Sequence, residues 1–245
     1  MASPTKNRTR KEIISNILIA AISLFINGFG VYLTIRASIG AGPWDVFSIG
    51  VSKTLGILYG SASILISFMI LGIDIILREP IGIAMIIDSL VVGKSVDFFN
   101  HLNAVPVPKT IIGGILMILL GLTIMGYTSY SYMNAALGCG PRDTLLVGIT
   151  KHMRNIPIGA ISILLLATAT LTGYFLGGPV GIGTLICAFA TGPIMQLAFK
   201  TVGFEPTTVS HQNFITTMQI FNLPVKSFSS GSISTDKGNK AQEEK

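Results

Sequence analysis

The segment Gly40–Asp45 reads GAGPWD, and a closely similar segment, GCGPRD, follows at Gly138–Asp143. The similarity between the two parts of the chain continues beyond these hexapeptides. Matching positions include Gly50 with Gly148, Lys53 with Lys151, Pro80-Ile81-Gly82 with Pro179-Val180-Gly181, and Gly93 with Gly192. A match that keeps glycines and prolines along its whole length indicates an internal repeat, and a repeat constrains the fold more strongly than any local pattern.

The composition is typical of a membrane protein. Hydrophobic residues make up 50% of the chain, charged residues only 11%, and the mean hydropathy is +0.68. A soluble domain carries about 25% charged residues. The net charge of +6 therefore indicates lysine and arginine retained on the cytoplasmic side of a membrane, and we expect no nucleic-acid partner.

Apolar segments long enough to cross a bilayer are separated by short breaks. A spanning helix needs about 20 apolar residues, and the segments that meet this length are 13–35, 57–77, 80–100, 109–133, 156–176 and 180–200. Two further apolar segments, 43–55 and 141–153, reach only about 20 Å as helices. Each begins with proline and has aspartate two residues later, which favours a helix start. We expect short helices there that are re-entrant or lie at the interface.

The predicted fold is an all-α membrane protein with about six spans, in which each repeat contains three transmembrane helices and one short helix. An odd number of spans per repeat inverts the second copy, whereas short helices that crossed fully would make the copies parallel. The change from Trp44 to Arg142 at matched positions favours the inverted arrangement, with an aromatic anchor outside and a basic residue inside. The expected organisation is a basic cytoplasmic N-terminus (1–12), membrane repeat 1 (13–100), a linker (101–108), membrane repeat 2 (109–200) and a flexible cytoplasmic tail (201–245).

Asp45 and Asp143 are candidate substrate or ion ligands, because ionisable groups inside a membrane are costly and usually functional. In the inverted fold they occupy equivalent points on two short helices that approach the centre. A carboxylate there could bind a cation or carry a proton. The alternative is that each aspartate only accepts hydrogen bonds from backbone N–H groups at its helix start.

The segment 80–100 carries three further charged candidates, Asp88, Lys94 and Asp97. Lys94 and Asp97 are three residues apart and share a helix face, where they could form an ion pair. An alternative is that Lys94 extends to the membrane surface and Asp97 lies near the interface. The second copy has Gln196 in place of Asp97, which makes the polar set asymmetric, and we include Gln196 among the candidate ligands.

The glycines and prolines of the repeated motif are expected to shape the turn into each short helix. They are Gly40, Gly42, Pro43, Gly138, Gly140 and Pro141. The sequence contains no phosphate-binding loop, no HExxH signature and no Cys/His cluster. We therefore expect no enzyme activity, no metal site and no cofactor.

The motifs GAGPWD and LGCGPRD, each followed five residues later by glycine (Gly50 and Gly148), and GGPVGIGT at 177–184 resemble those of the YczE/YyaS/YitT-like bacterial membrane proteins. The resemblance covers roughly residues 13–199. It implies a multi-pass protein of the bacterial plasma membrane, and it supplies no catalytic residues.

The repeat and the short helices together predict a transporter or channel for a small molecule or ion, with a site between the repeats. Two alternatives remain open: a non-transporting membrane accessory or scaffold protein, and the substrate-binding subunit of a larger transporter. The expected partners are the lipid bilayer and the transported solute, with self-association into a homo-oligomer left open. Both chain ends are expected in the cytoplasm.

Overall fold

The computed structural model describes residues 10–135, 137–138, 140–153 and 156–204, and all regular structure within them is α-helical. The expected tail, 201–245, lies mostly outside the described residues. The helices are α1 (Arg10–Arg36), α2 (Pro43–Leu55), α3 (Tyr59–Ile76), α4 (Ile83–His101), α5 (Ile111–Asn134), α6 (Pro141–His152), α7 (Ile158–Phe175) and α8 (Ile182–Thr201). The predicted all-α fold is confirmed, and both short helices begin at the expected prolines.

Helices α1, α3, α5, α7 and α8 are long and apolar enough to cross a membrane. Helix α4, which the sequence predicts to be a span, is not among them. It carries Asp88, Lys94 and Asp97 within 19 residues, and these charges interrupt its apolar character. The described residues therefore give a membrane protein with five candidate spans.

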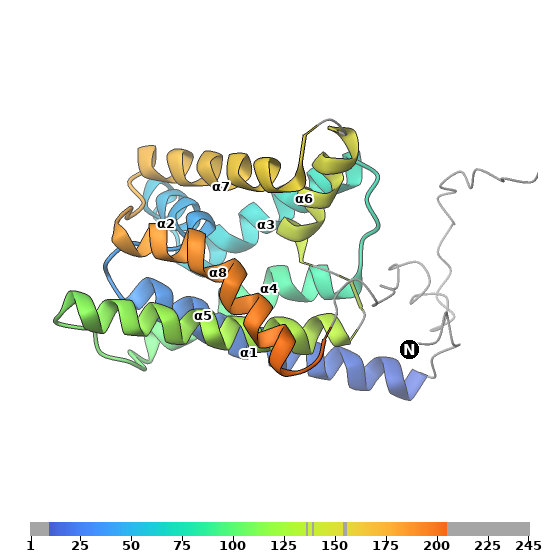
Figure 1. Ribbon diagram of the computed structural model, residues 1–245, viewed down its shortest axis with the longest axis horizontal. Coiled ribbons are helices and arrows are strands. Elements are labelled where there is room, and N and C mark those ends of the chain that lie inside the picture. Colours follow the sequence, from blue (N-terminus) through green and yellow to red (C-terminus); the bar gives the residue numbers. More distant parts are fainter. Residues whose placement is uncertain (1–9, 136, 139, 154–155, 205–245) are drawn as a thin grey trace, which may run out of the picture.

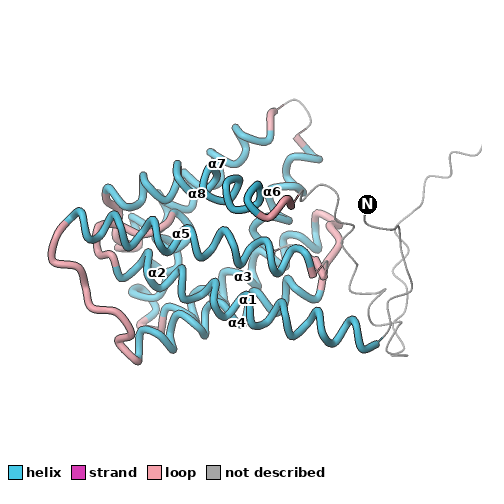
Figure 2. Tube along the Cα trace, turned by 60° about the horizontal axis from the view of Figure 1, so that its bottom comes forward, coloured by secondary structure: helices cyan, strands magenta, loops and turns pink. Residues whose placement is uncertain are grey.

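The helices form two groups (Figure 1). In one group α1 lies beside α5, with α4 packed on α1 and α8 packed on α5. The other group contains α3 and α7 together with the short helices α2 and α6. The tube view in Figure 2 shows the same bundle with α2 toward one end and α6 toward the other.

Helices α1 and α5 approach closely through glycine. A Cβ atom placed on Gly121 would lie 2.6 Å from the carbonyl oxygen of Gly30. The pair is antiparallel, because Ala37, just after the end of α1, faces Gly114 near the start of α5. Small residues let membrane helices gain van der Waals contact, which replaces the missing hydrophobic drive between helices in lipid.

Each short helix packs between α3 and α7. On α2, Gly50 lies against Gly173 near the end of α7. The corresponding residue on α6, Gly148, lies against Leu77 at the end of α3. Helix α3 therefore runs from the C-terminal end of α2 to the C-terminal end of α6, and α7 runs in the opposite direction. These C-terminal ends are called the outer ends of the short helices below.

A lysine in the last turn of each short helix contacts a neighbouring turn of the chain. Lys53 Nζ donates a hydrogen bond to the carbonyl of Gly177, at 2.8 Å, in the turn between α7 and α8. Lys151 Nζ lies 2.6 Å from Glu79 Oε2 in the turn between α3 and α4. These contacts fix the outer ends of α2 and α6 at two different turns.

The chain enters each short helix through an extended segment. The Ala41 N–H donates to the carbonyl of Pro179 at 3.3 Å, and on the other side the Ala84 N–H donates to the carbonyl of Leu137 at 3.1 Å. Gly40 and Gly138 have φ values of +114° and +119°, which favour glycine strongly. Glycine therefore suits positions 40 and 138, whereas Gly42 has an ordinary φ of −59°.

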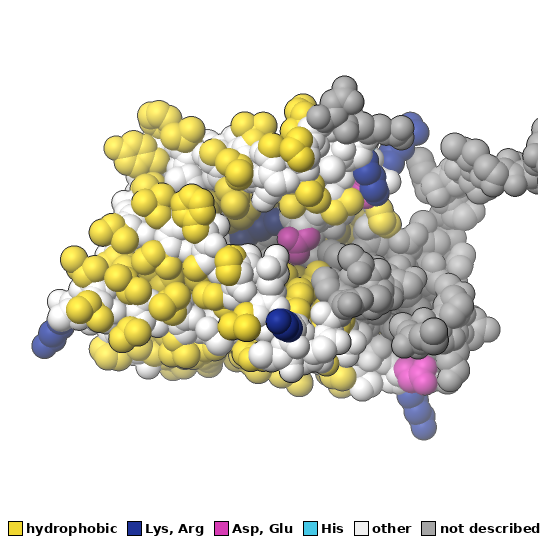
Figure 3. Space-filling view, in the orientation of Figure 1, with side chains coloured by type: hydrophobic (Ala, Val, Ile, Leu, Met, Phe, Trp, Pro, Cys, Tyr) yellow, Lys and Arg dark blue, Asp and Glu magenta, His cyan; other side chains and the backbone are white. Residues whose placement is uncertain are grey.

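The outer surface is strongly apolar, as the space-filling view in Figure 3 shows. The most exposed large side chains include Ile76, Ile112, Ile163, Phe175 and Phe189. Apolar exposure on this scale is unfavourable in water and suits contact with lipid.

We predict that Gly121→Ala destabilises the protein, by about 1–3 kcal/mol, because the new methyl group forces α1 and α5 apart. The measurement is thermal unfolding of the detergent-purified protein. The matched control is Gly72→Ala in α3, where a Cβ meets nothing within 4 Å and helix propensity favours alanine. Equal effects of the two substitutions would contradict the close α1–α5 contact.

Candidate binding site at the start of the short helices

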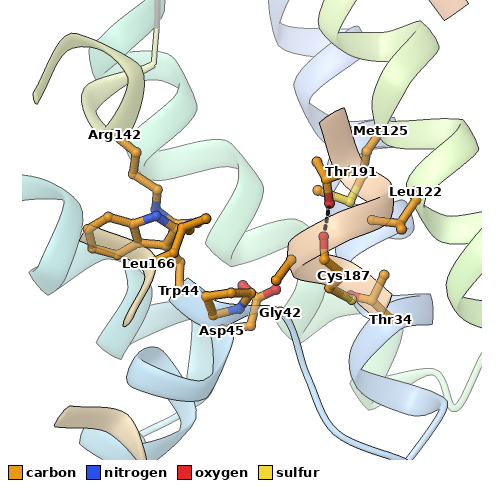
Figure 4. A pocket seen from close by; sticks show the side chains of 12 residues that line it. Thr34, Gly42, Trp44, Asp45, Leu122, Met125, Arg142, Leu166, Cys187 and Thr191 are labelled. Atoms are coloured by element: carbon orange, nitrogen blue, oxygen red, sulfur yellow. Dashed lines mark hydrogen bonds between the residues drawn. The ribbon is translucent and has the colours of Figure 1, made fainter. Parts of the chain in front are cut away.

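The short helices α2 and α6 begin beside one central cavity of about 170 Å³. Its walls include Leu122 of α5, Leu166 of α7 and Thr191 of α8, each close to the middle of its helix. Trp44 and Arg142, the second residues of α2 and α6, line the same space (Figure 4). The two short helices therefore start near the middle of the bundle.

Asp45 is buried at this cavity, with 7% of its surface exposed. Its Oδ1 accepts a hydrogen bond of 2.7 Å from the Tyr59 hydroxyl at the start of α3. No side-chain capping bond is made at the start of α2, where Gly42 occupies the cap position. Asp45 is thus held by the side chain of Tyr59.

Arg142 lies with its guanidinium carbon 5.3 Å from the centre of the Trp44 ring, and the two side chains lie one over the other in Figure 4. A guanidinium over an indole face gains cation–π attraction. Arg142 forms no ion pair with another described residue. Its side chain lines the wall of the cavity.

Asp88 and Asp143 meet on the α6 side. A Cβ on Gly140 would lie 3.1 Å from Asp88 Oδ2 and 3.8 Å from Asp143 Oδ2, so glycine leaves room for both carboxylates. Tyr132 of α5 interacts with Asp143. Figure 3 shows an acidic patch beside a basic one in a hollow near the middle of the apolar face.

The positive charge of Arg142 acts on all three carboxylates, Asp45, Asp88 and Asp143. These four residues are called the central charge cluster below. Three carboxyl groups and one guanidinium thus share a place with little water to screen their charges. The cluster can bind a cation, or it can hold protons on its carboxylates.

The other predicted ligands lie elsewhere. The ion pair that Lys94 and Asp97 could form is absent: Lys94 is exposed, and Asp97 Oδ1 instead accepts from the backbone N–H of Gly60 at 2.8 Å. The first N–H groups of a helix lack partners within it, and Asp97 satisfies one of them at the start of α3. Gln196 is exposed on α8 and lies on the opposite side of that helix from Cys187 at the cavity.

Sequence reasoning did not select Trp44, Arg142 or Tyr59 as site residues. The signal for the first two was present, because they occupy matched positions in the repeated motif. Tyr59 has no counterpart in the motif, and only the packing of α3 against α2 brings it to Asp45.

An all-helical membrane protein with a charged centre is the class that this fold and site define. Its sequence matches the model of a family described as "Family of unknown function (DUF6198)" over residues 14–200, and the chain belongs to that family. It is 31% identical over 195 residues to the "Uncharacterized membrane protein YczE" of Bacillus subtilis, covering 77% of this chain and 87% of that protein.

Two other relatives are similarly distant. An "Uncharacterized protein" of Haemophilus influenzae is 27% identical over 78% of this chain and 85% of its own length. The "Uncharacterized protein YyaS" of Bacillus subtilis is 26% identical over 74% of this chain and 90% of its own length. The resemblance to YczE and YyaS is therefore confirmed. No solved structure matches the chain.

We predict that Arg142→Gln destabilises the protein at neutral pH, because it leaves the three carboxylates facing one another. In the double variant Arg142→Gln/Asp143→Asn the loss should be smaller than the sum of the two single losses, by about 0.5–3 kcal/mol. Thermal unfolding in detergent measures this coupling. Arg142→Gln combined with Gln196→Leu is the control and should be additive. Additivity in both double variants would contradict the charge cluster.

Proposed function

We propose that this protein is a small transporter of cations, built from two inverted repeats that hold the central charge cluster between them. The helix pairings support the repeat. Helix α1 packs on α4 as α5 packs on α8, and α2 packs on α7 as α6 packs on α3. Exchanging the two halves of the chain therefore maps these contacts onto one another.

The opposite directions of matched helices support the inversion. In Figure 1, α1 and α5 run in opposite directions, as do α3 and α7. In this arrangement α4 is a sixth span, whose charged residues Asp88 and Asp97 face protein partners at Gly140 and Gly60. We place the protein in the bacterial plasma membrane with both chain ends in the cytoplasm.

Inverted repeats with broken helices are a recurring construction among secondary transporters, where the substrate site lies near the middle of the membrane. Backbone that is not helical is tolerated at that depth only where it lies within protein or lines a cavity. The cavity at the start of α2 and α6 meets this description. It is the observation that carries the proposal.

The charge of the site favours a cation as the solute. With all three carboxylates ionised, the central charge cluster has two negative charges in excess of its one positive charge. The starts of α2 and α6 together contribute the equivalent of about one positive charge. One further positive charge would balance the site, and a small monovalent cation, inorganic or organic, supplies it.

A second cavity offers a route to this site. It has a volume of about 290 Å³ and is lined by Arg36, Lys53, Tyr59 and Asp97, among others. Tyr59 thus faces the second cavity while its hydroxyl holds Asp45 at the first. We infer that breaking the Tyr59–Asp45 hydrogen bond joins the two cavities into one path.

We predict cation uptake by proteoliposomes that contain the purified protein, tested separately with Na⁺, methylammonium and guanidinium as probes. Asp45→Asn and Asp143→Asn should each lower the initial rate by at least about tenfold, the factor that corresponds to about 1.4 kcal/mol of lost interaction. The control Gln196→Leu alters an exposed side chain and should keep the wild-type rate.

Rates that stay unchanged in both aspartate variants would contradict this site. Uptake no greater than in empty liposomes for all three cations would contradict the transport proposal and favour an accessory membrane protein. Co-purification with a stable partner in mild detergent would then be the expected accompanying result.

A further inference from the structure

Asp74, near the end of α3, lies outside the central charge cluster. Its side chain is fully buried, and neither of its carboxyl oxygens has a hydrogen-bond partner among the residues that the structure describes. An ionised carboxylate without a partner costs a very large free energy in such surroundings, and a buried acid avoids the cost by keeping its proton. The geometry therefore favours the neutral acid at this position.

The charged groups near Asp74 either contact other residues or are exposed. Glu79, whose N–H donates to the Asp74 carbonyl at 3.0 Å, is paired with Lys151 of α6. Arg78 is exposed and makes no ion pair with Asp74. His152 of α6 contacts the carbonyl of Gly148 through Nδ1. No described cation therefore neutralises Asp74.

The charges of α4, which also packs on α3, lie at other contacts. Asp88 is at Gly140, Asp97 is at Gly60, and Lys94 is exposed. The group that acts electrostatically on Asp74 is Glu79. A second acid so close makes ionisation of Asp74 still less favourable.

The second repeat shows that packing does not require an acid here. The residue that matches Asp74 is Gly173, and the residue that matches Glu79 is Gly178. In that half Lys53 bonds the carbonyl of Gly177 instead of a carboxylate. The acid pair is thus particular to the α3–α6 contact, which joins one repeat to the other.

We propose that Asp74 is a proton-binding site, with H⁺ as its ligand. In the structure as it stands, Lys151 neutralises Glu79 and Asp74 keeps its proton. When α6 moves along α3 and carries Lys151 from Glu79 toward Asp74, the O–H bond of Asp74 breaks. The electron pair stays on the Asp74 carboxylate, the lysine ammonium neutralises it, and the proton passes to Glu79, which has lost its cation.

Lys151 suits this exchange because 58% of its side chain is exposed, whereas the Glu79 side chain is 5% exposed. The lysine can therefore move while the two acids stay in place. A proton that passes between the two acids at the contact between the repeats would couple H⁺ to their relative motion. This coupling, unlike the proton site itself, rests on the proposed transport function.

The test is a potentiometric titration of the full-length protein in detergent between about pH 9 and about pH 5, a range in which ordinary aspartates stay ionised. We expect Asp74→Asn to take up one proton fewer per chain than the wild type. Asp74→Glu keeps a carboxyl group in place and should keep the wild-type count. Equal counts for wild type and Asp74→Asn would overturn the proposal.

A second measurement guards against loss of the folded state in a variant. Asparagine has nearly the shape of a neutral aspartic acid, so Asp74→Asn should unfold at a temperature close to that of the wild type at about pH 5. At higher pH it should be the more stable of the two, because the wild type must then release a buried proton. Marked destabilisation of Asp74→Asn at every pH would overturn the proposal. Neither measurement depends on transport, so each can fail or succeed independently of cation uptake.

Discussion

Every backbone N–H and C=O group inside a bilayer needs a hydrogen-bond partner within the protein. The two extended segments that lead into α2 and α6 cannot supply these partners by themselves, because they are not helical. The structure supplies them by pairing each segment with the turn of the other half. Ala41 bonds Pro179 between α7 and α8, and Leu137 bonds Ala84 at the start of α4. Because each half supplies the partners of the other, neither half could place its short helix in lipid alone.

This mutual pairing explains which positions carry the same residue in the two similar segments and which positions differ. Gly40 and Gly138 hold a backbone conformation that side chains disfavour, and each lies against a glycine of the opposite turn. The residues four positions after these glycines, Trp44 and Arg142, can differ because they line a cavity. They bring an aromatic ring and a guanidinium together. Two similar segments thereby give an asymmetric centre.

The sequence predicts the helices well because length and hydrophobicity determine them, and the prolines at 43 and 141 mark the short helices correctly. It predicts Asp45 and Asp143 as candidates because their positions repeat. The sequence does not predict side-chain contacts between residues that are distant along the chain. Asp97 turns to a backbone N–H of α3 and not to Lys94, and Tyr59 reaches Asp45 only through the packing of α3 on α2. Spacing along one helix cannot reveal such contacts.

In the proposed inverted arrangement, α2 and α6 start together near the middle of the membrane and end on opposite membrane surfaces. Single cysteines at Thr54 and His152, both exposed near the outer ends of these helices, test it in a background without Cys139 and Cys187. An impermeant thiol reagent is added to whole cells and to permeabilised cells. The inverted arrangement predicts that one position reacts in whole cells and the other only after permeabilisation. Reaction of both positions under the same condition would contradict it.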